Sequence, residues 1–218
     1  FDAQAPFIHW ETALNQYDEW TPAVDDLFAY AYTGLYEPRL SIVERTSGIE
    51  ARSIPDPDFV WNGWSMQLAP VLGSANDLIV IQAQRLISFD LLLDTIRFQI
   101  EGALLQGQPS LASGRIFALA SGALTVWDEL TGDFLWSWAP TEPLTGTILV
   151  TKSHILTRSA THTFAVDQAS HEEVWSIPIS GHLAWSEGVL FLAGEDGFLT
   201  AIRAPAQVFQ DGFESGTT

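Results

Sequence analysis

The sequence contains no cysteine, and this absence excludes three kinds of chemistry. Without a thiol the chain cannot form disulfide bonds, bind a metal ion through thiolates or use a cysteine nucleophile. An oxidising compartment stays compatible with the composition, because many exported proteins fold without any cysteine. The compartment therefore has to be inferred from other features.

Basic residues are scarce. The chain has 9 Lys and Arg against 27 Asp and Glu, which gives a formal net charge of −18. A phosphate-rich partner would be repelled by this charge rather than attracted. The composition therefore argues against nucleic acid and against anionic membranes as partners.

Long apolar runs are also missing. A helix that crosses a bilayer needs about 18 or more apolar residues, and runs such as 78–81 and 189–193 are far shorter. No charged segment followed by an apolar one opens the chain at Phe1, so we expect that a signal peptide either has been removed or never existed. The sequence predicts no insertion into a membrane.

Apolar and aromatic residues are abundant, at 47% and 12% of the 218 residues, and nine of them are Trp. A disordered chain would be more polar and less aromatic. The length is sufficient for one substantial core. We therefore expect a packed protein, and the repeats described next favour a single domain.

A repeated strand, turn and strand unit around an acidic residue organises the chain. The apolar run 124–127 ends at Asp128, and Trp136 follows eight residues after that acid. Asp167 and Trp175 have the same spacing. Two further copies share this frame with changes: Asp90 with Phe98, and Glu44 with Arg52 in the aromatic position.

The spacing of these acids predicts the fold, because they recur at roughly 40 residues, the length of a propeller blade. The fourth residue after each acid tolerates a left-handed backbone: Gly48, Asp94, Gly132 and His171. Two more apolar strands precede each acid, as in 108–111 and 115–119. We predict an all-β fold, a β-propeller of four-stranded antiparallel blades with about five blades in this chain.

Both ends carry partial repeats. Trp10 stands eight residues after Asp2, while the segments 188–193 and 197–203 have no final aromatic strand after them. We expect residues 1–204 to form the propeller, with a strand around 7–10 completing the last blade and closing the ring. Residues 205–218 are then a C-terminal tail. The alternative is that the chain is the C-terminal piece of a larger propeller.

The repeat resembles that of the PQQ-like, or quinoprotein-like, propeller family. The residues that carry the resemblance are Thr125–Asp128 with Thr131, Gly132 and Trp136, then Phe164–Asp167 with Trp175, and Gly194–Ile202. The resemblance implies the fold but leaves the activity open. The family includes quinone-dependent alcohol and sugar dehydrogenases and also cofactor-free scaffolds such as an outer-membrane assembly lipoprotein.

The tail 209–216 resembles a short C-terminal motif of exported proteins in some Gram-negative bacteria. This resemblance implies export. We therefore expect a periplasmic, outer-membrane-associated or extracellular location in such a bacterium.

The repeated residues are interpreted as structural. Trp10, Trp136 and Trp175 have faces that could stack on a sugar or a quinone, but their fixed place in the repeat favours packing between blades. Asp90 and its counterparts recur once per blade, which favours caps of turns over a catalytic carboxylate pair. The same structural role is expected for the remaining repeat positions: Phe98, Asp128 and Asp167.

Other polar groups give weak signals. The acidic pairs at Asp25–Asp26, Asp56 with Asp58, and Glu195–Asp196 lack the spacing of a calcium loop, so we interpret them as solvated surface. The five His have no zinc-motif spacing, and no nucleophile elbow, P-loop or dinucleotide fingerprint is present. We predict no catalytic residue, no metal site and no cofactor.

Two insertions interrupt the regular repeat, at 33–39 and 55–64, and carry Tyr36, Trp61 and Trp64. Exposed aromatic residues on a rigid scaffold often bind partners, although these Trp could also fold back over a blade edge. We favour a non-catalytic exported propeller that binds a protein or glycan partner through these three residues. The alternatives are a quinoprotein dehydrogenase or a fragment of one, which would need a Ca²⁺ pocket beneath the quinone, and a structural or assembly protein that self-associates through open blade edges.

Overall fold

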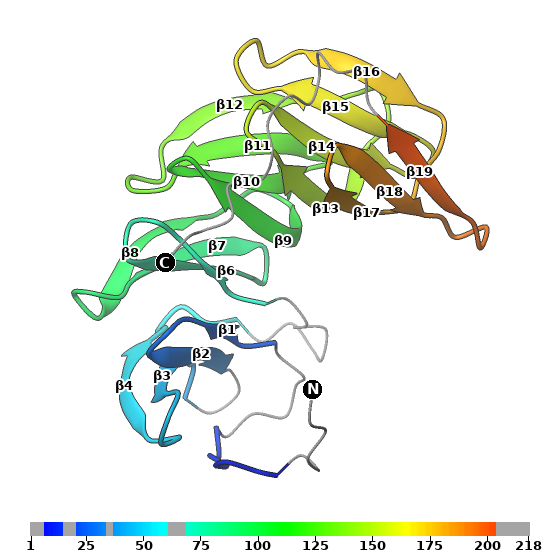
Figure 1. Ribbon diagram of the computed structural model, residues 1–218. Helices are drawn as coiled ribbons and strands as arrows, with labels where there is room; N and C mark the ends of the chain where they lie inside the picture. Colours follow the sequence, from blue (N-terminus) through cyan, green and yellow to red (C-terminus); the bar gives the residue numbers. More distant parts are fainter. Residues whose placement is uncertain (1–6, 15–20, 34–36, 61–68, 204–218) are drawn as a thin grey trace.

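The computed structural model describes residues 7–14, 21–33, 37–60 and 69–203 and contains five antiparallel sheets (Figure 1). Neighbouring strands in each sheet are also neighbours in sequence, as in a simple meander. We name the sheets blades A to E in chain order. No helix in the described part of the chain is long and apolar enough to span a bilayer.

Nineteen strands make up the blades. Blades A and B contain β1 (Ala23–Val24), β2 (Phe28–Thr33), β3 (Arg39–Glu44), β4 (Glu50–Pro55), β5 (Val71–Leu72), β6 (Asp77–Gln82), β7 (Arg85–Asp90) and β8 (Thr95–Ile100). Blades C and D contain β9 (Leu105–Ala112), β10 (Arg115–Ala120), β11 (Ala123–Asp128), β12 (Phe134–Trp138), β13 (Leu144–Val150), β14 (His154–Ser159), β15 (Thr163–Asp167) and β16 (Glu173–Ile177). Blade E contains β17 (His182–Ser186), β18 (Val189–Ala193) and β19 (Leu199–Arg203).

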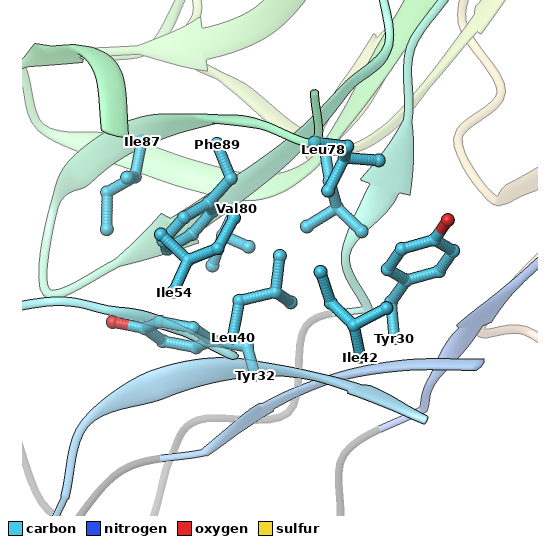
Figure 2. Close-up of a cluster of buried hydrophobic side chains, with 10 residues drawn as sticks. Tyr30, Tyr32, Leu40, Ile42, Ile54, Leu78, Val80, Ile87 and Phe89 are labelled. Carbon is cyan, nitrogen blue, oxygen red and sulfur yellow. The ribbon is translucent and has the colours of Figure 1, made fainter. Parts of the chain in front are cut away.

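The apolar runs of the sequence are strands buried on both faces. In β6, Leu78 and Val80 pack in the core between blades A and B, whereas Ile79 and Ile81 pack in the core between blades B and C. Successive side chains of a strand point to opposite faces, so the central residues of a strand between two blades are apolar on both faces. Figure 2 shows the first of these cores, where Tyr32 and Leu40 of blade A meet side chains from β6 and β7.

The first strands of successive blades lie next to one another: β1 beside β5, β5 beside β9, β9 beside β13, and β13 beside β17. Glycine permits the closest of these approaches. A Cβ at Gly107 in β9 would lie only 2.7 Å from the carbonyl oxygen of Gly146 in β13. Both glycines also have positive φ, at 72° and 82°, so a larger residue would be strained there.

The turn that follows each repeated acid has one backbone shape. The fourth residue after the acid has positive φ in all four copies: Gly48 at 72°, Asp94 at 51°, Gly132 at 75° and His171 at 62°. The left-handed conformation predicted from the sequence is therefore confirmed.

These turn residues also connect the blades. Each contacts the residue in the aromatic position of the preceding repeat, and we call this contact a blade joint. The four joints are Trp10 on Gly48, Arg52 with Asp94, Phe98 on Gly132 and Trp136 on His171. At the glycine joints the ring covers the turn closely, since a Cβ at Gly132 would lie 2.6 Å from Phe98.

The N-terminal segment corrects one prediction. Phe7–Trp10 is not a strand and does not pair with blade E, which has three described strands. Instead the Trp10 Nε1–H donates to the carbonyl oxygen of Arg45 at 2.8 Å, in the turn of blade A that also holds Gly48. The segment is beside blade A because its aromatic residue makes the same joint as the other repeats. Figure 1 shows blades A and E at opposite ends of an arc.

Candidate functional site

An open groove of about 370 Å³ lies between blades C and D. Five side chains define it, and we call it the Trp138 groove: Trp138, Glu142, His162, Phe164 and Glu173. Trp138 is the last residue of β12, and Glu142 belongs to the connection to β13. His162 precedes β15, which contains Phe164, and Glu173 begins β16. Both blades therefore contribute to the groove.

Aromatic rings form its floor. The Trp138 and Phe164 rings meet edge to face, with centroids 5.4 Å apart and an angle of 64° between their planes. The His162 ring stacks on Phe164 at 6.0 Å. Phe164 is buried in the core between blades C and D, while Trp138 and His162 keep part of their surface in solvent. The exposed aromatic surface is thus fixed to a rigid core.

Glu142 provides an oriented negative charge in the groove. Its carboxylate accepts hydrogen bonds from the hydroxyls of Thr161 at 2.7 Å and Ser159 at 2.8 Å. These bonds, with the nearby His162 ring 4.0 Å away, hold the pKa of Glu142 below its usual range. The carboxylate is therefore ionised at neutral pH. Glu173, which also lines the groove, is exposed.

The aspartates of the repeat lie in turns around the molecule and do not come together. Each accepts backbone N–H groups from the second and third residues after it, at 2.7–3.0 Å: Asp90 from Leu92 and Leu93, Asp128 from Leu130 and Thr131, and Asp167 from Ala169 and Ser170. These bonds, above all the one from the third residue, hold the pKa of each aspartate below its usual range. The arrangement stabilises turns and offers no carboxylate pair for catalysis.

The repeated aromatic residues pack between blades. Trp136 belongs to the core of blades C and D, and its ring stacks on His171 with centroids 4.2 Å apart. Phe98 packs against the core between blades B and C, and Trp175 against the core between blades D and E. Trp10 covers the turn of blade A. These faces are occupied by the protein itself.

The predicted contact residues Tyr36, Trp61 and Trp64 lie outside the described residues. The described parts of their two insertions meet, because Glu37–Arg39 and Pro55–Pro57 line one cavity of about 430 Å³. The Asp56 N–H donates to the carbonyl oxygen of Pro38 at 2.8 Å. The structure therefore joins two insertions that are separate in the sequence.

The prediction that Asp56 is solvated surface is wrong. Asp56 is 2% exposed and forms an ion pair with Arg85 of β7 at 2.6 Å. The Tyr32 hydroxyl also donates to it, at 2.5 Å. Sequence inspection missed this site because Arg85 lies in the neighbouring blade. The signal that could have found it was a basic residue at the start of a buried strand.

A second buried acidic site joins blades B and C and was also missed. Asp77 of β6 and Glu129, which follows β11, are 0% and 1% exposed. Both accept the N–H of Ala75, at 3.1 and 3.2 Å, and Glu129 also accepts the N–H and hydroxyl of Ser74. Burial, with the Glu129 charge close by, raises the pKa of Asp77 to about 6. Arg97 lies 3.9 Å from the other Asp77 oxygen.

Comparison with known proteins tests the fold. No family model matches the chain, and no curated protein matches it. Among solved structures the chain is similar to BamB from Moraxella catarrhalis, a β-propeller, with a TM-score of 0.70 and 14% identity over 89% of this chain and 61% of that one. The fold is a β-propeller. The all-β, roughly five-bladed architecture predicted from the sequence is confirmed.

The chain spans less than two thirds of the length of BamB. A variant of KlHsv2 in which a Gly-Ser linker replaces loop 6CD has a TM-score of 0.47 and 13% identity, over 64% of this chain and 48% of that one. At 14% identity the similarity to BamB concerns the fold and not the activity.

The quinone-dependent alternative can be compared with the residues present. Such an enzyme would need oxygen ligands for a Ca²⁺ ion beneath the quinone. Within the described ranges, no group of three or more His, Asp or Glu side chains is placed to hold a metal ion. These residues do not fit the cofactor, and we derive no reaction step from it.

Proposed function

We propose that this chain is a non-catalytic, exported propeller scaffold that binds a protein partner through the Trp138 groove. The observation that carries the proposal is the combination of partly exposed aromatic rings, a rigid floor and an oriented carboxylate in one open groove. Aromatic anchors on a rigid scaffold are the residues that contribute most to protein interfaces. The resemblance of the tail 209–216 to an export motif supports the location.

The test is binding of the purified chain to a random peptide library and to a glycan array. We expect saturable peptide binding that the substitution Trp138→Ala reduces at least tenfold. Leu130→Ala, at an exposed residue outside the groove, is the matched control and should leave binding unchanged. Binding of glycans alone would replace the protein partner with a glycan. Peptide binding that is indifferent to Trp138→Ala would overturn the groove as the site.

The insertions provide a second proposed contact region. Tyr36, Trp61 and Trp64 stay predicted contact residues, since the described parts of both insertions line one cavity. Replacing Trp61 and Trp64 together with Ala and measuring affinity for a peptide selected from the library tests their role. Unchanged affinity would remove these residues from the binding surface.

A second candidate function is assembly through an open blade edge, and blade E favours it. In the described part of the chain β19 pairs with β18 alone, and Leu199 at its start is 71% exposed. An unpaired edge of this kind can add a strand from another chain. Size-exclusion chromatography with light scattering should then show oligomers that Ile202→Pro abolishes. A monomer at every concentration would refute this function.

A further inference from the structure

We propose that the Trp138 groove binds a positively charged side chain, lysine or arginine, presented by the partner protein. This inference rests on the proposed function and specifies the chemistry of its ligand. Three properties of the groove support it: its aromatic surface, its charge and its carboxylate hydrogen-bond acceptors.

The aromatic surface of the groove can attract a cation. Trp138 keeps part of its indole in the groove while its ring is held against Phe164 at 5.4 Å. The face of an indole attracts an ammonium or guanidinium group within about 6 Å, and more strongly than the face of Tyr or Phe does. A floor that is already fixed by the core adds little entropic cost on binding. The groove can therefore hold the stem and the charged head of such a side chain.

The carboxylates that line the groove are negatively charged. Glu142 and Glu173 line it, and none of its described lining residues is Lys or Arg. The hydroxyls of Ser159 and Thr161 fix the orientation of the Glu142 carboxylate. The net charge of −18 would also accelerate encounter with a basic partner. An anionic ligand would be repelled for the same reasons.

The carboxylates of the groove favour a ligand that donates hydrogen bonds. Carboxylates accept hydrogen bonds and do not donate them, while ammonium and guanidinium groups only donate. The hydroxyls of Ser159 and Thr161 already donate to Glu142, so they are not available to a sugar hydroxyl as donors. The Glu142 carboxylate is therefore matched to the ammonium of lysine or the guanidinium of arginine.

The experiment measures binding of tetralysine and tetraarginine peptides to the full chain by titration calorimetry in 150 mM salt, with tetra(acetyl-lysine) as the uncharged probe. We expect saturable binding of at least one cationic peptide and none of the acetylated one. The double variant Glu142→Gln/Glu173→Gln should weaken that binding at least tenfold. The double variant Glu101→Gln/Glu195→Gln removes the same charge from exposed positions outside the groove and should weaken it less than threefold.

Two further variants test the aromatic part. Trp138→Phe keeps a ring and should bind more strongly than Trp138→Ala, with circular dichroism used to check that each variant folds. The glutamine variants keep the inference testable even where Trp138→Ala does not fold, because exposed carboxylates contribute little to the core.

Some results would overturn the inference. Equal weakening by the two double glutamine variants would mean attraction to the whole acidic surface and not to the groove. Absence of binding by both cationic peptides would also refute it. A library peptide that binds in a Trp138-dependent way without lysine or arginine would refute this inference and leave the proposed function intact. Failure of all peptides would refute both.

Discussion

The guanidinium of Arg52 lies 2.8 Å from the carboxylate of Asp94, at a blade joint where two other repeats place an aromatic ring on a glycine. The two departures from the repeat compensate each other. The aspartate places a carboxylate at the turn position, and the arginine in the aromatic position forms an ion pair with it. Arg52 also donates to the carbonyl oxygen of Leu91 at 2.9 Å.

This pairing predicts that the joint can be exchanged as a unit. Arg52→Trp alone or Asp94→Gly alone creates a mismatched joint and should lower the free energy of unfolding by about 1 kcal/mol, the upper range for a partly exposed ion pair. The double variant restores a ring on a glycine and should recover most of that loss. Urea unfolding followed by tryptophan fluorescence measures all three. Strictly additive losses in the double variant would contradict the exchange.

The joint at Trp136 should dominate the stability of blades C and D. Trp136 is 9% exposed and lies within their core, so Trp136→Ala should cost about 3–5 kcal/mol. Its indole nitrogen has no hydrogen-bond partner among the described residues. Trp136→Phe should therefore retain most of the stability. The control is Phe134→Ala, at a residue of the same strand that is 61% exposed, and a comparable loss there would contradict this explanation.

The buried Arg85–Asp56 ion pair predicts that the stability of the protein depends strongly on both partners. Both side chains are buried, so Arg85→Ala leaves an unpaired carboxylate and should cost about 3–5 kcal/mol in chemical unfolding. Arg85→Met with Asp56→Asn removes both charges and should cost less than Arg85→Ala alone. Arg45→Ala, at an arginine that is largely in solvent, should cost less than about 1 kcal/mol. If the double variant lost more stability than Arg85→Ala, the unpaired charge would not be the cause of the destabilisation.

The buried pair of Asp77 and Glu129 predicts a pH dependence. Because the folded-state pKa of Asp77 is raised from 3.8 to about 6, its contribution to stability is fully present below about pH 4 and is lost as the pH rises through 6. Asp77→Asn should remove this loss. The stability of Asp77→Asn relative to the wild type should therefore increase by about 1–3 kcal/mol between pH 4 and pH 7.

Unfolding measured at several pH values tests this prediction. Asp90 and Asp167, which accept the N–H groups of their turns, have lowered pKa values and act in the opposite direction. Their contribution to stability is lost as the pH falls. These two aspartates are present in both proteins, so their effect cancels when Asp77→Asn is compared with the wild type. A constant stability difference across the pH range would contradict the role of Asp77.

Structural features that lie within one repeat could be predicted from the sequence. The strand before Asp128, the left-handed turn at Gly132 and the position of Trp136 all follow from short-range backbone preferences and from period-two burial. These features recur along the chain, so even imperfect copies reinforced one another. The number and type of the blades could be predicted for that reason.

Contacts between blades could not be predicted in the same way. Asp56 was interpreted as solvated because its partner Arg85 belongs to the next sheet. The Trp138 groove combines the end of a blade C strand, the loop that follows it and two strands of blade D, and none of these residues forms a motif by itself. The spacing of Trp10 from Asp2 matched the repeat, but this spacing does not indicate which turn the indole ring covers.

The blade joints have a consequence for how such a chain can change in length. Each described repeat from blade A to blade C carries both halves of a joint, a residue that covers the following turn and a turn that is covered by the preceding repeat. An in-frame duplication of about 40 residues, one repeat length, would bring both halves with it. A gene of this kind could therefore gain or lose a blade in one recombination event, and the new neighbours would fit each other at once.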